Sequence, residues 1–123
     1  MGMLLLVIDD DPDQRRLLER VLGAAGHRVV TAADGRSGAD AARALQPDAV
    51  ILDVLMPGLN GYQTCRAIRQ DPATAQVPVI ILTSKDEPTD ALWSEEVGAN
   101  AFLPKPVDVP ALLRTVADLT GTA

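Results

Sequence analysis

Residues that form covalent cross-links or carry glycans are nearly absent from this sequence. The only cysteine is Cys65, which therefore cannot form an internal disulfide, and no Asn-x-Ser/Thr acceptor site occurs. Both absences favour a reducing, cytoplasmic location over an extracellular one. A lone cysteine on the apolar side of an expected helix usually contributes packing, so we do not expect Cys65 to be a functional thiol.

Basic residues and long apolar runs are also scarce. The chain has 11 Lys and Arg residues against 17 Asp and Glu residues, which gives a net charge of −6 and a pI of about 4.5. This balance removes the attraction that dominates binding to nucleic acids and anionic membranes, so neither is an expected partner. The longest apolar run, Met3–Ile8, is far shorter than the roughly 18 residues of a membrane span. It also lacks the basic flank of a signal peptide.

Acidic residues, by contrast, stand at the ends of two apolar runs. The run Leu4–Ile8 is followed by Asp9 and Asp10, and the run Ala49–Asp53 ends with Asp53. Short apolar runs bounded by turn residues predict strands that are buried on both faces of a parallel sheet. Because a ligand crevice in such sheets lies outside the carboxyl ends of the strands, we expect the three carboxylates to converge.

Converging carboxylates raise one another's pKa unless a cation compensates them, and Mg²⁺ takes oxygen ligands of this kind. A helix start is the alternative explanation for part of the acidic run. Asp11 is a suitable N-cap, Pro12 suits the first helical position and Gln14 would complete a capping box. Capping explains Asp11 but not Asp9 and Asp10, which we therefore assign to a metal site.

Strand and helix patterns alternate five times along the chain. Strands are expected at Leu4–Ile8, Arg28–Ala32, Ala49–Asp53, Val79–Leu82 and Ala101–Leu103, and helices near Asp13–Ala24, Gly35–Leu45, Gly61–Gln70, Thr89–Val97 and Val109–Leu119. This pattern predicts one α/β domain over residues 1–123, a doubly wound (βα)5 three-layer sandwich of the flavodoxin-like type. Right-handed crossovers and a ligand site at the switch point favour a parallel sheet of order 2-1-3-4-5.

Two more functional groups follow strands at the same edge of the expected sheet. Thr83 lies at the end of the fourth expected strand, directly after Leu82, and Lys105 follows the fifth. Each residue alone is ambiguous, since a threonine there often forms a turn and a lysine is often only solvated. Together with the acids they form a set suited to phosphoryl chemistry: a carboxylate nucleophile, a divalent cation, a lysine and a hydroxyl donor.

With these motifs in place, the chain resembles the receiver domain of bacterial response regulators over nearly its whole length. The matching segments are Val7–Pro12, Leu52–Gly61, Ile81–Ser84, Gly98–Phe102 and Lys105-Pro106. The resemblance implies a phosphoacceptor in a two-component or phosphorelay system. It also implies a protein that catalyses only its own phosphorylation and dephosphorylation and is otherwise not an enzyme.

The resemblance also implies roles for individual residues at the acidic edge. Asp53 would accept a phosphoryl group from a partner's phosphohistidine. Asp10, Asp53 and the backbone carbonyl of Leu55 would bind Mg²⁺ or Mn²⁺ directly, and Asp9 would do so through water. The cation would cancel the repulsion between the anionic nucleophile and the anionic phosphoryl group.

A second set of residues would bind the phosphoryl group and respond to it. Lys105 would contact the acyl phosphate, Thr83 would donate a hydrogen bond to it, and the small Ser84 would leave room for access. Phe102 matches the aromatic that moves when Thr83 does, although an ordinary core phenylalanine is an equally good explanation. The Lys105–Pro106 peptide bond is expected to be cis, as in the family.

The partners implied are a histidine kinase or histidine phosphotransfer protein as donor and a downstream protein. The chain cannot supply the phosphohistidine, since His27 is its only histidine and has no partner motif. The downstream partner would bind the face of the helix near Thr89–Val97, the fifth strand and the last helix. Trp93 lies there, either as an exposed anchor or packed on the sheet.

We expect a monomer or a weak, phosphorylation-dependent dimer. The sequence ends soon after the last expected helix, which fits either a free-standing receiver or a domain of a larger regulator or hybrid kinase.

Three alternatives belong to other functional classes. A haloacid-type phosphatase would carry Asp-x-Asp, whereas Asp53 is followed by Val54 and Leu55. An FMN carrier would need a phosphate-binding first loop, and the acids at Asp9–Asp11 would repel a phosphate. Nucleotide binding has no motif support, because neither Gly-x-Gly-x-x-Gly nor a Walker A sequence is present. A receiver-like adaptor that signals without phosphorylation stays open.

Overall fold

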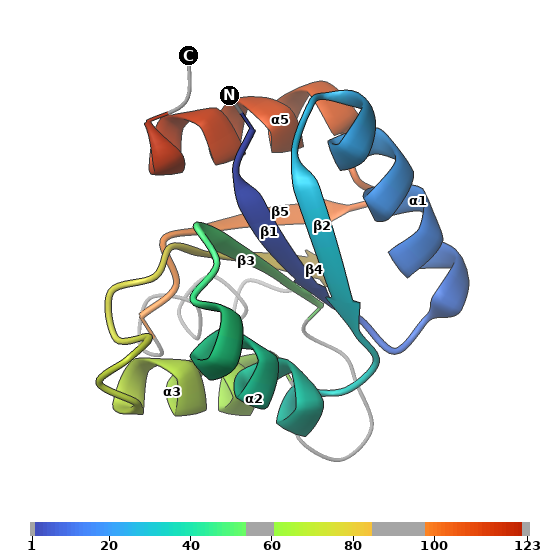
Figure 1. The fold of residues 1–123 in the computed structure, drawn as a ribbon. Helices are drawn as coiled ribbons and strands as arrows, with labels where there is room; N and C mark the ends of the chain where they lie inside the picture. The colour runs from blue at the N-terminus through green and yellow to red at the C-terminus, as the bar shows by residue number, and fades with distance from the viewer. Residues whose placement is uncertain (1, 54–60, 85–97, 122–123) are drawn as a thin grey trace.

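The computed structural model describes residues 2–53, 61–84 and 98–121 of the chain. The strands are β1 (Leu4–Ile8), β2 (Arg28–Ala32), β3 (Ala49–Asp53), β4 (Val79–Ser84) and β5 (Ala101–Lys105). The helices among these residues are α1 (Pro12–Ala24), α2 (Gly35–Leu45), α3 (Gly61–Gln70) and α5 (Val109–Thr120) (Figure 1). The predicted helix near Thr89–Val97, with Trp93, lies outside the described residues, and so does Leu55.

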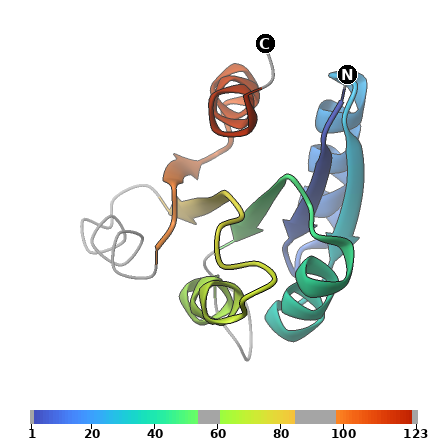
Figure 2. The same cartoon turned by 60° about the vertical axis from the view of Figure 1, so that its left-hand side comes forward.

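The five strands form one parallel sheet of order β2-β1-β3-β4-β5, which confirms the predicted order and fold class. In Figure 2 the strands follow one another across the view from β2 on the right to β5 on the left. β2 lies on one side of β1, and β3 lies on the other side. The direction in which successive strands are added to the sheet therefore reverses between β1 and β3. Such a switch point is where α/β sheets place their ligands.

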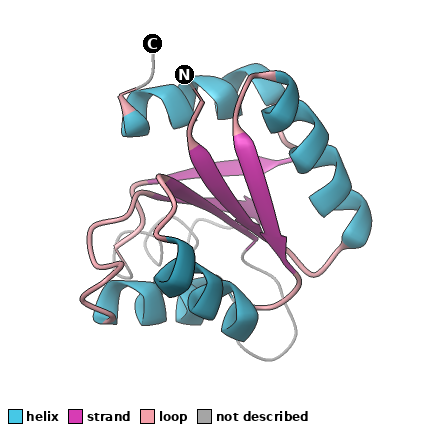
Figure 3. Cartoon of the chain, viewed as in Figure 1, coloured by secondary structure: helices cyan, strands magenta, loops and turns pink. Residues whose placement is uncertain are grey.

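Helices cover both faces of the sheet, which makes a three-layer sandwich (Figure 3). Alternate residues of β1 supply the two cores, as the side-chain period of a strand requires. Leu5 and Val7 pack with residues of α1 and α5, whereas Leu6 and Ile8 pack with residues of α2 and α3. All four side chains are fully buried, which explains why this strand reads as a continuous apolar run.

β4 and β5 are each two residues longer than the sequence predicts. The predicted ends were Leu82 and Leu103, but pairing continues between Thr83 and Pro104 and between Ser84 and Lys105. β5 lies at the edge of the sheet, where a proline removes no ladder hydrogen bond that the strand needs. The extension makes Lys105 part of the sheet instead of a following loop.

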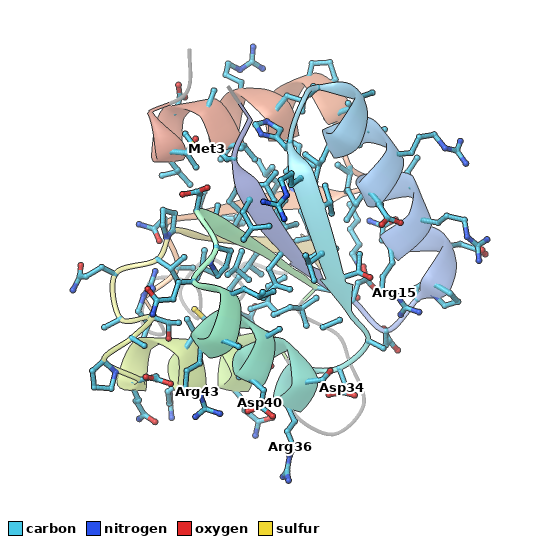
Figure 4. The ribbon with its side chains drawn as sticks, viewed as in Figure 1. Met3, Arg15, Asp34, Arg36, Asp40 and Arg43 are labelled. Carbon is cyan, nitrogen blue, oxygen red and sulfur yellow. The ribbon has the colours of Figure 1, made fainter. Side chains whose placement is uncertain are left out.

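The N-terminal segment is held against the turn before β2. The amide of Met3, labelled in Figure 4, donates a hydrogen bond to Nδ1 of His27 at 3.1 Å. The half-buried His27 is thus a structural acceptor in the described fold. None of the described helices has the length and apolar character that a membrane crossing requires.

Gly38 allows α2 to pack closely on the end of β1. A Cβ atom at this position would lie 2.5 Å from Cδ1 of Ile8 and within 2.9 Å of two further Ile8 atoms. Since Ile8 is fully buried and precedes Asp9, any displacement acts beside the acidic cluster. Gly38→Ala should therefore lower the free energy of unfolding by about 1–3 kcal/mol in urea titrations.

Gly23→Ala is the matched control for this substitution. Gly23 also lies in a helix, but a Cβ there would meet nothing within 4 Å. The loss of backbone entropy in the unfolded chain should raise stability by about 0.5–1 kcal/mol. Equal effects of the two substitutions would show that contact with Ile8 does not limit the residue at position 38.

Candidate functional site

Four charged side chains meet at the carboxyl ends of the strands. Asp9 and Asp10 follow β1, Asp53 is the last residue of β3 and Lys105 is the last residue of β5. Carboxylate oxygens of the three acids lie within 4.8 Å of one another. Nζ of Lys105 donates a hydrogen bond to Oδ1 of Asp53 at 2.6 Å. The predicted convergence of the acids is therefore confirmed, and the lysine joins them.

The members of this cluster differ in exposure. Asp9 is 1% exposed and Asp53 4%, so both carboxylates are withdrawn from bulk solvent. Asp10 is exposed, and the Lys105 side chain is about one-third exposed at 32%. Asp10 and Lys105 are therefore the solvent-exposed part of the cluster.

The backbone and side chain of Asp9 are fixed by local hydrogen bonds. Its amide donates to the carbonyl of Ala32 at 3.0 Å, which continues the pairing of β1 with β2. Its Oδ1 accepts from the amide of Asp11 at 2.9 Å. Its Oδ2 is buried and accepts no hydrogen bond from any described residue. Buried carboxylate oxygens rarely stay unpartnered, so this atom fits a cation ligand.

The start of α1 corrects one detail of the sequence interpretation. Asp11 is the N-cap and accepts from the amide of Asp13 at 2.9 Å, as expected. In a capping box the amide of Asp11 would donate to Gln14, but here it donates to Asp9. The predicted box is therefore wrong, because the carboxylate at the end of β1 takes the donor instead.

Burial raises the pKa of Asp9 from 3.8 to about 6. The hydrogen bond from the Asp11 amide opposes this shift, the neighbouring Asp53 carboxylate adds to it, and the charge of Lys105 opposes it. The folded, metal-free protein thus holds a proton on Asp9 more tightly than the unfolded chain does. Ionisation of Asp9 costs folding free energy as the pH rises through 6.

The donor set matches a hard divalent cation. Three carboxylates and one ammonium leave a net charge of −2 when all four groups are ionised. Oxygen is the ligand atom that Mg²⁺ prefers, and the ion commonly uses only one or two protein carboxylates and keeps several waters. Asp9, Asp10 and Asp53 therefore fit Mg²⁺ in both charge and chemistry.

The remaining predicted residues lie along β4 and β5. Thr83 and Ser84 close β4, directly beside Pro104 and Lys105, although their side chains lie outside the described structure. Phe102 is 41% exposed, which contradicts the alternative that it is an ordinary core phenylalanine. The Lys105–Pro106 peptide bond is cis, as the family resemblance implies.

Arg15 is a contact of the site that sequence reasoning missed. Its Nη1 donates a hydrogen bond to the backbone carbonyl of Asp9 at 2.8 Å. One feature of the sequence indicated this contact. Arg15 lies near the N-terminus of α1, where the helix dipole disfavours a positive charge.

Comparison with known proteins places this site in a family. The sequence profile described as response regulator receiver domain matches residues 5–117. The match covers most of the chain, so the protein belongs to the response regulator receiver domains. These domains take phosphoryl groups from histidine kinases in two-component signalling, which is the function implied by the sequence motifs.

Individual relatives agree with this membership. The chain is 43% identical to protein PilH of Pseudomonas aeruginosa, with 91% of this chain and 93% of PilH covered. It is 43% identical to response regulator PleD of Caulobacter vibrioides over 98% of this chain but only 26% of PleD. A Pseudomonas aeruginosa structure matches with a TM-score of 0.90 and 30% identity over 98% of this chain and 99% of the other. That structure is the receiver domain of sensor histidine kinase PA1611 with a magnesium ion coordinated in its active-site cleft.

Replacement of Asp9 should stabilise the metal-free protein at neutral pH. Asp9→Asn removes the buried charge, so at pH 7.5 in EDTA its free energy of unfolding should exceed that of the wild type by on the order of 1–3 kcal/mol. The wild type loses stability as the pH rises from 4 through 6, whereas the asparagine does not titrate. The difference should therefore disappear near pH 4 in urea titrations.

Asp10→Asn serves as the control, because it removes an exposed carboxylate from the same cluster. It should raise the metal-free stability less than Asp9→Asn does. A larger gain for Asp10→Asn would mean that burial of Asp9 is not the main cost in this cluster.

Proposed function

We propose that this receiver domain accepts a phosphoryl group on Asp53 in an Mg²⁺-dependent reaction. The observation that carries the proposal is the 2.6 Å contact of Lys105 with Asp53 beside Asp9 and Asp10. This arrangement gives a nearly buried nucleophile, a cation site and a positive side chain at one point. Asp53 is the acceptor because its oxygens face both Lys105 and the other two acids.

The cation would be held by Asp10, Asp53 and the backbone carbonyl of Leu55, with Asp9 contributing through water. Mn²⁺, which also prefers oxygen ligands, would substitute for Mg²⁺. The magnesium ion of the PA1611 receiver supports this assignment. When bound, the cation supplies the positive charge that lets an anionic carboxylate approach an anionic phosphoryl group.

The chemistry that the chain's own residues perform is a nucleophilic displacement. A carboxylate oxygen of Asp53 forms a bond to phosphorus as the phosphorus–nitrogen bond of the donor phosphohistidine breaks. The electron pair of that bond returns to the partner's imidazole. Lys105 would neutralise charge on the transferred group, Thr83 would donate a hydrogen bond to it and Ser84 would leave room for access. In support, Thr83 and Ser84 end β4 and pair with Pro104 and Lys105. Phe102, exposed on β5, would change its environment as Thr83 responds.

The wider assignments follow from the same function. Residues 1–123 would act as one receiver domain in the cytoplasm, which modifies only itself and is not otherwise an enzyme. A histidine kinase or histidine phosphotransfer protein is the donor. The downstream protein would bind the face of the predicted helix near Thr89–Val97, β5 and α5, with Trp93 as a candidate anchor. The domain would be a monomer or a weak, phosphorylation-dependent dimer.

Acetyl phosphate provides a direct test of the acceptor. Intact-mass spectrometry of the wild type should show one added phosphoryl group when Mg²⁺ is present and none when EDTA replaces it. Asp53→Asn should gain no mass in either condition, because its amide is not a nucleophile of this kind.

Asp48→Asn is the control for this experiment, since Asp48 is a structural acceptor for the amide of Leu4 far from the cluster. It should be phosphorylated as the wild type is. A folded wild type that gains no phosphoryl group, and that binds no Mg²⁺, would favour the phosphorylation-independent adaptor instead.

Mg²⁺ binding should depend on pH through Asp9. A protonated Asp9 cannot serve as an anionic partner of the cation, and its pKa in the metal-free protein is about 6. Saturating Mg²⁺ should therefore raise the melting temperature more at pH 7.5 than at pH 5. Differential scanning fluorimetry measures this, and an equal rise at both pH values would contradict the involvement of Asp9.

A further inference from the structure

Arg15 reaches from α1 to the end of β1. Its Nη1 donates to the carbonyl of Asp9 at 2.8 Å, and the side chain is half-buried. Figure 4 shows Arg15 on the part of α1 nearest the carboxyl ends of β1 and β2. Side chains in a helix lean toward its N-terminus, so a long residue in the early part of α1 can reach back over the preceding loop.

The Asp9 carbonyl needs a donor that the sheet does not supply. Pairing of β1 with both neighbours ends at Ile8, which is opposite Ala32 on one side and Leu52 on the other. Asp9 lies one residue beyond these pairs, and its amide is still bound to Ala32. The hydrogen bond from Arg15 therefore fixes the remaining polar group of the Asp9 backbone.

The contribution of Arg15 is geometric and not an attraction for the metal. Within the described residues, Arg15 forms no ion pair with a carboxylate. A positive charge beside a cation site repels the cation. If Arg15 acted only through its charge, removal of that charge would strengthen Mg²⁺ binding.

We propose that Arg15 is a positioning residue of the metal site. By holding the Asp9 carbonyl, it fixes the peptide unit between Asp9 and Asp10 and so directs both carboxylates toward Asp53. This inference rests on the proposed function, because it assumes that the three acids bind Mg²⁺. Partners of this kind, which orient ligands without touching the metal, typically matter strongly for affinity.

Two substitutions separate geometry from charge. Arg15→Lys keeps the charge but replaces the planar guanidinium with a shorter, freely rotating ammonium. Arg15→Met keeps an apolar stem and removes both charge and donor. Arg16→Met is the matched control, because exposed Arg16 is the next residue of α1 and pairs only with Asp13, at 3.5 Å, among the described residues.

Isothermal titration calorimetry of the full chain with MgCl₂ at fixed ionic strength gives the dissociation constants. Arg15→Met should bind Mg²⁺ about tenfold more weakly than the wild type, and Arg15→Lys should also bind more weakly although its charge is unchanged. Arg16→Met should stay within about twofold, because exposed charges are largely screened. Circular dichroism verifies that each variant is folded.

A second readout excludes general structural damage. In acetyl phosphate reactions, the Mg²⁺ concentration that gives half-maximal rate should rise for each Arg15 variant by the same factor as its dissociation constant. A purely structural role would lower the metal-free melting temperature without this parallel shift. If Arg15→Met does not fold, the Mg²⁺ affinity of Arg15→Lys alone tests the positioning role.

The outcomes distinguish this inference from the proposed function. Unchanged or tighter Mg²⁺ binding by Arg15→Lys or Arg15→Met, with normal binding by the wild type, would overturn the positioning role only. An effect of Arg16→Met as large as that of Arg15→Met would overturn it too. Absence of Mg²⁺ binding by the folded wild type would overturn the proposed function and this inference together.

Discussion

The placement of acidic side chains side by side, at Asp9, Asp10 and Asp53, is the constraint to which the rest of the molecule responds. One oxygen of each carboxylate lies within 4.8 Å of the others, and like charges this close repel one another. Two of the three groups are almost completely buried, which adds a desolvation cost. The fold must therefore hold these groups together with apolar and hydrogen-bonded structure that contributes nothing to the chemistry itself.

The parallel sheet supplies that structure. β1 and β3 are almost wholly apolar and buried from both faces, so their ends cannot separate without exposing the two cores. The sheet order brings the ends of these strands together, and pairing of β5 with β4 brings Lys105 to the same edge. Close packing of α2 at Gly38 against Ile8 holds the end of β1 in place. Hydrophobic burial over the whole domain thus maintains an unfavourable charge cluster at one point.

Much of this arrangement can be predicted from sequence because it depends on patterns that have few alternatives. Continuous apolar runs that alternate with helical segments allow one sheet class, and acids placed directly after two of those runs must meet. Strand ends were less predictable. Thr83, Ser84 and Pro104 favour turns when considered singly, and only their pairing across β4 and β5 keeps them in the sheet. The exposure of Phe102 likewise depends on β5 being an edge strand.

Local competition explains two further features, one that sequence reasoning placed wrongly and one that it missed. The amide of Asp11 has two possible acceptors, Gln14 and Asp9, and in the structure it donates to Asp9, two residues earlier. The contact of Arg15 with the Asp9 carbonyl depends on where the sheet pairing stops. Neither choice leaves a periodic signal in the sequence, because both are made by single hydrogen bonds at the junction of a strand and a helix.

Lys105, at the end of β5, links the acidic site to the exposed edge of the sheet. Lys105 is bound to Asp53 and is also the last residue of β5, so any new anion on Asp53 competes directly for a side chain of the edge strand. Phe102 lies three residues earlier on that strand and is exposed. Under the proposed function, a charge change at Asp53 would act first on Lys105 and so on the edge strand that also carries Phe102. The three acids thus lie beside the last residue of the edge strand, where neutralisation or modification of Asp53 would change the contact of Lys105.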